Sequence, residues 1–450
     1  MFFNGEKSKK GQLSGVQILA LGFVILILVG GILLSLPISS ASGEYTNLLD
    51  SLFTATSAVC VTGLVTLDTG TYWSAFGQTI IIILIEIGGL GFMAFTTLLA
   101  ILLKRRITLR DRLIIQEAMN TFSIKGIVKM VEQIVIFTIF VQVLGGLILS
   151  TQFITEFGVL KGICYGIFHS ISAFCNAGFD LFGNYSSVTS YSSNTLVLLL
   201  LSAIIVISGL GFTVILDLFK FRKTRRLSTH SKLALSITGI LIVVGVVFIF
   251  ILEYNNPETI GNMTFKDKVI NSIFSGISPR TAGFNSISLD GMTIGGKFLT
   301  ILLMFIGGSP GSTAGGFKTV TFGIVLLTVI SVLKGRDDIE AFGRRFSQSL
   351  VNKAFVILMI ALSLVVGVTM LLCITQPGEK FIDLLYEATS AFATVGLTTG
   401  VTQRLNDIGK IIIMVTMYLG RVGPLTVALA LTNRRKKKGY RYPETKILIG

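Results

Sequence analysis

Charged residues are scarce in this sequence. They make up 14% of the 450 residues, whereas 52% are hydrophobic, and soluble domains carry about 25% charged residues. The chain therefore lacks the polar surface that it would need to face water on all sides. Several apolar stretches reach the roughly 20 residues that cross about 30 Å of hydrocarbon. The composition excludes an ordinary soluble domain and indicates a polytopic membrane protein.

Residue types that commonly carry catalysis or bind metals are also few. The sequence has only two histidines, which are predicted to lie on opposite sides of the membrane, and four cysteines without C-x-x-C spacing. No nucleophile and general base recur at a spacing typical of catalysis. The sequence therefore indicates neither an enzyme nor a cofactor held by this chain.

Acidic residues are outnumbered, 23 against 38 Lys and Arg, for a net charge of +15. Of the basic residues, 28 fall in five patches that each abut an apolar stretch: 7–10, 104–129, 220–232, 334–353 and 434–446. This positive-inside pattern predicts that the patches and both termini are cytoplasmic. A nucleic-acid contact is the alternative for 434–438. The position of the basic patches beside apolar stretches instead favours a role in orienting the chain in a plasma membrane, with no nucleic-acid partner.

One short segment occurs four times along the chain. Its copies read A-T-S-A-V-C-V-T-G-L, S-I-S-A-F-C-N-A-G-F, S-G-I-S-P-R-T-A-G-F and A-T-S-A-F-A-T-V-G-L. The glycines that they share are 115, 105 and 113 residues apart: Gly63, Gly178, Gly283 and Gly396. A nearly constant period over the whole chain indicates an internal fourfold repeat.

Each copy lies between two long apolar stretches. The first stretches are 13–36, 130–150, 233–252 and 354–374, and the second are 77–103, 194–219, 298–333 and 408–431. Because the copies are too short and polar to cross a bilayer, we expect re-entrant loops that line water or protein. All four enter from the outer face. The predicted fold class is an all-α polytopic membrane protein, with four parallel helix–pore loop–helix repeats (eight transmembrane helices) and pseudo-fourfold symmetry around a central pore. The predicted repeats are 1–112, 113–226, 227–336 and 337–450, and the last includes a basic cytoplasmic tail.

Backbone carbonyls at the four loops suit an alkali cation, whose hydration shell must be replaced by oxygens. Glycine permits close approach of the backbone, and the sequence shows no ring of four acidic side chains. We therefore predict a K+ selectivity filter of backbone carbonyls. The alternative is that the glycines merely end short helices. The predicted filter residues are Cys60, Val61, Thr62, Gly63, Cys175, Asn176, Ala177, Gly178, Arg280, Thr281, Ala282, Gly283, Ala393, Thr394, Val395 and Gly396.

The second apolar stretch of the third repeat is interrupted by a run that cannot hold a helix, since Gly costs about 1 kcal/mol and Pro about 3 relative to Ala. We predict an intramembrane gate loop there, with a helix kink as the alternative. The predicted gate residues are Gly307, Gly308, Ser309, Pro310, Gly311, Ser312, Thr313, Ala314, Gly315 and Gly316, with Lys318 and Arg421.

Charges at membrane depth are costly and are therefore presumed to be functional. Arg421 is predicted to hydrogen-bond the loop carbonyls and to repel cations, whereas the alternative is an ion pair with Glu86. Lys318 is either part of the gate or extends toward the cytoplasm.

The four loop sequences resemble those of the Trk/Ktr/HKT superfamily of K+ transporters over essentially the full chain. With eight spans and no extra N-terminal helices, the chain is most similar to the Ktr membrane subunits of the B or D type. The resemblance implies Na+-stimulated K+ uptake across the bacterial plasma membrane. It also implies a homodimer with a pore in each protomer, and a cytosolic regulatory ring of the KtrA or KtrC type that binds nucleotide.

The third loop departs from the other three, because it is one residue shorter between its Ser and Gly and carries Arg280. The predicted filter is therefore only pseudo-symmetric. The rival hypothesis is an alternating-access cation carrier (a K+/Na+ symporter), for which inverted repeats are expected.

Overall fold

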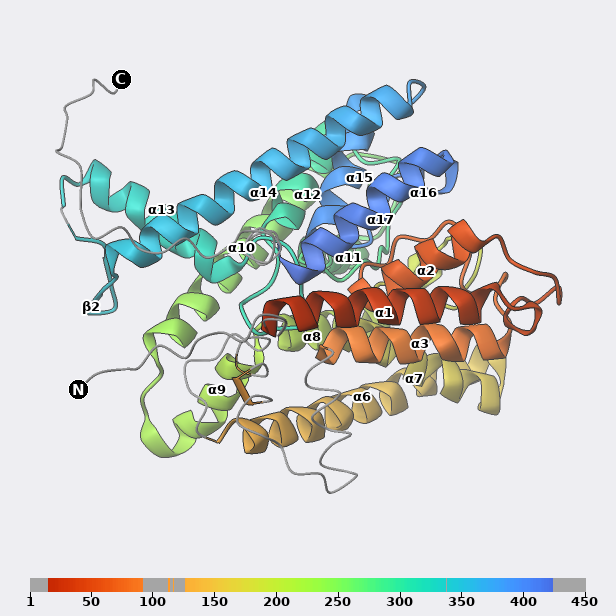
Figure 1. Cartoon of the computed structure of the whole chain (residues 1–450), viewed down its shortest axis with the longest axis horizontal. Helices are drawn as coiled ribbons and strands as arrows, with labels where there is room; N and C mark the ends of the chain where they lie inside the picture. Colours follow the sequence, from red (N-terminus) through yellow and green to blue (C-terminus); the bar gives the residue numbers. More distant parts are fainter. Residues whose placement is uncertain (1–14, 92–111, 114–115, 117–125, 337, 424–450) are drawn as a thin grey trace, which may run out of the picture.

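Four long helices form the frame of the molecule. The computed structural model describes residues 15–91, 112–113, 116, 126–336 and 338–423. In this part of the chain, four helices are long and apolar enough to cross a membrane: α1 (Gly15–Ser35), α6 (Ile127–Phe157), α10 (Thr229–Glu253) and α14 (Gln348–Thr375). They coincide with the predicted first span of every repeat (Figure 1).

A shorter helix follows each of these spans. The four short helices are α2 (Leu48–Cys60), α7 (Val159–Cys175), α11 (Phe265–Ile277) and α15 (Phe381–Ala393). At 13 or 17 residues they are too short to cross a bilayer, and α2, α7 and α11 each pack against the long helix that precedes them. They are the predicted pore helices. The chain is thus an all-α polytopic membrane protein built from four parallel helix–pore loop–helix repeats around one axis.

The second span is interrupted in the second and third repeats. The interruption in the third was predicted, whereas the continuous stretch expected at 194–219 in the second was wrong. In the second repeat α8 (Thr195–Gly209) and α9 (Phe212–Thr224) meet at 95°. In the third, α12 (Ile294–Phe305) and α13 (Thr319–Leu333) are separated by a loop. In the other two, α3 (Ala75–Leu90) and α17 (Asp407–Val422) end early, and the rest of the predicted spans, 92–103 and 424–431, lies outside the described residues.

Glycine occupies three of these helix boundaries. Gly91, Gly211 and Gly423 have φ of 84°, 91° and 93°, with ψ of 137°, 139° and 126°. Residues with a side chain rarely adopt this conformation, which is not helical, so a glycine in it marks the boundary of a helix. These boundaries recur in three repeats because glycine recurs there.

The remaining elements are short. They comprise two 3₁₀ turns, one four-residue helix and one hairpin: η1 (Pro37–Ser39), η2 (Thr189–Tyr191), α16 (Val401–Arg404), β1 (Glu340–Ala341) and β2 (Arg344–Arg345). The hairpin pairs Glu340 with Arg345 in antiparallel register. It lies in the basic patch between the third and fourth repeats.

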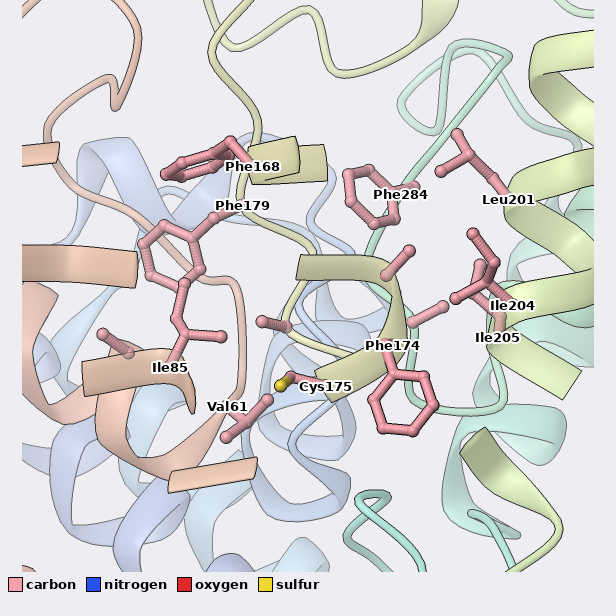
Figure 2. Packing of buried hydrophobic residues seen from close by; sticks show 14 of the residues in the cluster. Val61, Ile85, Phe168, Phe174, Cys175, Phe179, Leu201, Ile204, Ile205 and Phe284 are labelled. Atoms are coloured by element: carbon pink, nitrogen blue, oxygen red, sulfur yellow. The ribbon is translucent and has the colours of Figure 1, made fainter. Parts of the chain in front are cut away.

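Buried side chains join neighbouring repeats rather than filling each repeat separately. Figure 2 shows the end of α7, where Phe174 and Cys175 lie between Val61 of the first repeat and Ile204 of α8. Phe284 of the third repeat belongs to the same cluster. A second cluster joins the first repeat to the fourth and so closes the ring. The repeats therefore stabilise one another by shared burial.

Two ion pairs, one buried and one half-buried, hold successive repeats together at equivalent positions. Lys297 Nζ lies 2.9 Å from Asp383 Oδ1, and Lys410 Nζ lies 2.7 Å from Asp50 Oδ1. Each lysine belongs to a second span, and each aspartate to the pore helix of the next repeat. Breaking such a pair leaves an uncompensated buried charge, which is strongly destabilising. These contacts fix the pore helices at their outer ends.

Candidate functional site

Three of the four pore helices end in the same turn. The residue after each helix is left-handed: Val61 (φ 56°, ψ 51°), Asn176 (58°, 45°) and Thr394 (50°, 55°). The next N–H binds the carbonyl five residues back, for example Thr62 N to Ser57 O at 2.8 Å. This is the 6→1 bond of a Schellman cap, which satisfies carbonyls at the helix end.

The third loop reaches the same geometry by a different route. α11 ends at Ile277, and Thr281 is the left-handed residue with φ 77°. The N–H of Ala282 binds Ser278 O at 2.9 Å, a bond one residue shorter than in the other loops. The one-residue difference in the sequence is therefore absorbed at the helix end, and Gly283 is not displaced from the ring described next.

The four shared glycines meet in a closed ring. A Cβ built on each one would lie 3.0 Å or less from the carbonyl oxygen that precedes the corresponding glycine in the next repeat. The order runs once around the chain: Gly63 to Ala177, Gly178 to Ala282, Gly283 to Val395 and Gly396 to Thr62. Helix capping alone would not bring these glycines together. Four of the carbonyls predicted for the filter, those of Thr62, Ala177, Ala282 and Val395, thus lie against the glycine of a neighbouring repeat.

Each turn is stabilised by hydrogen bonds to a serine. This serine lies six residues before the glycine in three repeats and five residues before it in the third. The backbone N–H of Gly63 donates to Ser57 Oγ at 3.0 Å, and that of Gly396 to Ser390 Oγ at 3.1 Å. Ser172 Oγ donates to the Phe179 carbonyl at 2.7 Å, and Ser278 makes the corresponding bond to Phe284. These serines were not predicted from the sequence, although their regular spacing from the glycines was a signal for them.

The other predicted filter residues take distinct places. Cys60, Cys175 and Ala393 are the last residues of their pore helices and are buried. The side chain of Arg280 leaves the ring and lies toward α10, with Nη2 3.4 Å from Thr238 Oγ1. The Arg280 guanidinium therefore lies against α10 and not inside the ring.

The glycine-rich run 307–316 is a loop, as predicted, and it is pressed against the ring. Ile306 and Phe317 form a parallel β-bridge at its base. Thr313 Oγ1 accepts a hydrogen bond from Asn176 Nδ2 at 3.0 Å and donates to the Phe174 carbonyl at 3.2 Å. A Cβ on Gly315 would collide with Thr394. The loop therefore contacts the turns of Asn176 and Thr394, and a Cβ on Gly307 would lie 3.3 Å from Thr281 in a third turn.

The break between α8 and α9 also holds this loop. Ser309 N donates to Gly209 O at 2.9 Å, and Phe212 N donates to Gly311 O at 2.8 Å. These backbone groups are freed by the interruption of the span, and at membrane depth they need partners. The broken second span and the loop of the third repeat thus satisfy each other's backbone groups.

Arg421 and Lys318 both bind carbonyls of this region. Arg421 donates to Thr313 O and to Gly88 O, at the end of α3. Lys318 Nζ donates to Ala314 O at 2.5 Å and Gly315 O at 3.3 Å, so it folds back onto the loop instead of extending away. The predicted hydrogen bond from Arg421 to the loop is present. A cation on α17 therefore joins the loop to the first repeat.

The alternative ion pair between Arg421 and Glu86 does not form among the described residues. Glu86 Oε2 instead accepts hydrogen bonds from Gln142 Nε2 at 2.8 Å and Cys175 Sγ at 3.3 Å. Both partners come from the second repeat. Glu86 therefore ties α3 to α6 and to the end of α7, and it is independent of the guanidinium.

Four re-entrant turns in one ring, with a loop against them, define a membrane protein of the pore-loop class. A model of the family described as TrkH, cation transport protein, matches residues 14–437. The chain belongs to this family.

Relatives of known name cover nearly the whole chain. It is 44% identical over 450 residues (99% of both chains) to the potassium/sodium uptake protein NtpJ of Enterococcus hirae. It is 40% identical to the Ktr system potassium uptake protein B of Bacillus subtilis over 96% of both chains, and 33% identical to protein D of that species over 97% of this chain and 98% of the relative.

Among solved structures, the potassium transporter TrkH from Vibrio parahaemolyticus superposes with a TM-score of 0.71 over 95% of this chain and 87% of that one. The two are 16% identical. This likeness concerns the fold, and it agrees with the arrangement of repeats described above.

Proposed function

We propose that the chain conducts K+ into the cell as the channel-like, ion-translocating subunit of a Ktr-type system. The observation that carries the proposal is the closed ring of Gly63, Gly178, Gly283 and Gly396 against the preceding carbonyls of the next repeat. Carbonyl oxygens around a narrow axis replace the hydration shell of an alkali cation. Relatives at 33–44% identity bear the names of potassium, or potassium/sodium, uptake proteins.

The loop 307–316, with Lys318 and Arg421, is proposed as the gate. What supports this role is its contact with the turns of Asn176 and Thr394, together with the fixed charge of Arg421 beside it. The proposal includes a homodimer in the plasma membrane and a cytosolic nucleotide-binding ring that moves the loop. It also includes Na+ stimulation. These three elements rest on the family resemblance and on the names of the Ktr relatives.

Growth of a K+-uptake-deficient bacterium at low K+ tests the function directly. Expression of this chain is expected to restore growth, and more strongly with a Ktr regulatory subunit than without it. Rubidium or K+ flux should then be measured with and without Na+. Restored growth without measurable K+ or rubidium flux would contradict the proposal that the chain conducts K+. Obligatory 1:1 coupling of Na+ to K+ would favour the carrier.

The orientation of the loops can be tested by cysteine labelling. In a background with Cys164 and Cys373 replaced by Ser, the two remaining cysteines are buried. Tyr45→Cys lies in an exposed loop on the side of the pore helices, and Arg336→Cys in the basic patch between repeats. An impermeant maleimide should label the first in intact cells and the second only after permeabilisation. Labelling of both from outside would refute the proposed topology.

A further inference from the structure

An apolar groove of about 500 Å³ lies between α6 and α9, apart from the pore axis. Its walls are one face of each helix, because the lining residues recur every three or four positions. Ile136 and Phe140 of α6 and Phe219 of α9 are 62%, 62% and 60% exposed. Exposed side chains of this kind on a membrane helix face lipid. The groove is thus open to the bilayer.

One end of the groove is cationic. Lys220 and Lys223 line it, one turn apart on α9, together with the amide of Gln133. Asp217 on the same helix accepts hydrogen bonds from Ser231 Oγ at 2.6 Å and from the Ser228 N–H at 2.9 Å. Both lysines line this end of the groove, and neither forms an ion pair among the described residues; Asp217 attracts Lys220 without pairing with it.

The depth of this cationic end matches a lipid headgroup. α9 turns away from α8 by 95° and runs beside the beginning of α6 (Figure 1). Under the orientation proposed above, its basic end faces the inner leaflet, where anionic lipids attract lysines. An apolar trough that ends in two lysines complements an acyl chain that ends in a phosphate.

We propose that an anionic phospholipid of the inner leaflet binds this groove. Its acyl chain lies along Phe137, Phe140 and Phe219, and its phosphate contacts Lys220 and Lys223. The site borders the loop 307–316, because α9 begins at Phe212, whose N–H donates a hydrogen bond to the Gly311 carbonyl. A bound lipid therefore restrains the helix to which the loop is tied. The binding site itself does not depend on the proposed K+ conduction.

Native mass spectrometry of the full chain in detergent tests the site, with phosphatidylglycerol and phosphatidylcholine as the added lipids. Wild type is expected to retain phosphatidylglycerol preferentially. Each lysine near an anionic headgroup contributes about fivefold to affinity, so K220Q/K223Q should weaken retention about 30-fold. The matched control R222Q/R225Q removes two charges from the end of the same helix, outside the groove, and should retain the lipid. Ile215→Trp, which fills the groove without changing its charge, should abolish retention.

Several outcomes would overturn this proposal. One is equal retention of phosphatidylglycerol by K220Q/K223Q and wild type, and another is equal retention of both lipids by wild type. Displacement of the lipid by millimolar inorganic phosphate would identify a free-anion site. A shift from dimer to monomer in Ile215→Trp would show that a second copy of the chain covers the groove. Circular dichroism and elution volume of each variant confirm that it is folded.

Discussion

Replacing Arg421 with Ala is expected to raise K+ uptake more than tenfold at equal amounts of protein. A unit charge about 8 Å from a passing cation costs about 2 kcal/mol at an effective dielectric of about 20, and each 1.36 kcal/mol is about tenfold in rate. The substitution also removes the hydrogen bond that holds Thr313 of the loop. Uptake should therefore depend less on the cytosolic regulator. Flux and expression are to be measured in the same cells.

Two control variants separate charge from structure. Arg421→Lys keeps the charge and should remain near wild type in uptake. Arg404→Ala makes the same change at an exposed arginine whose side chain binds Glu379, with Nε 2.7 Å from Oε1, instead of carbonyls of the loop. Leaving the Gly88 and Thr313 carbonyls unpaired costs about 1–3 kcal/mol each, so expression must be reported. Normal expression with uptake at or below wild type would contradict the gate.

Gly283→Ser is expected to lower K+ uptake at least about tenfold, the effect of a barrier raised by about 1.4 kcal/mol. A Cβ at this position would lie 2.5 Å from Val395 O and 2.8 Å from the Cα of Gly178. The side chain would therefore displace a carbonyl of the proposed filter. Preference for K+ over Na+ should weaken as well, because the spacing of the oxygens sets it.

Gly43→Ser is the matched control for this substitution. Gly43 has φ +73°, close to the +79° of Gly283, but a Cβ there would meet nothing within 4 Å. Both substitutions incur the left-handed penalty of about 1–2 kcal/mol, and only one obstructs the ring. Unchanged uptake and ion preference in well-expressed Gly283→Ser would remove Gly283 from the filter.

The sequence was sufficient for features that repeat. Hydropathy predicted the four long helices, and the period of the glycines predicted the re-entrant turns between the spans. The run 307–316 was recognisable as a loop because its composition is incompatible with a helix. Each of these signals is local or periodic, so a single sequence contains it.

Apart from the hydrogen bond between Arg421 and the loop, most side-chain and backbone contacts between repeats were not predicted. The bend after Gly209 was missed because one or two glycines in an apolar span are commonly tolerated. The partners that satisfy the freed backbone groups, Ser309 N and Gly311 O, belong to another repeat. The pairing of Glu86 with Gln142 and Cys175 joins two repeats and leaves no trace in either one alone. The inter-repeat lysine–aspartate pairs were missed for the same reason.

Fusion of four repeats into one chain lets each corner of the ring change alone. Two junctions carry a lysine–aspartate pair, whereas the second and third repeats meet through Asn271 Nδ2 and Ser192 O at 2.8 Å. In a tetramer of identical subunits, a favourable charge at one corner would appear at all four and repel its copies. Here a single guanidinium, Arg421, stands on one side of the axis. A ring built from one chain thus has a freedom that symmetric assemblies lack: a substitution can change one quadrant while the other three preserve the geometry.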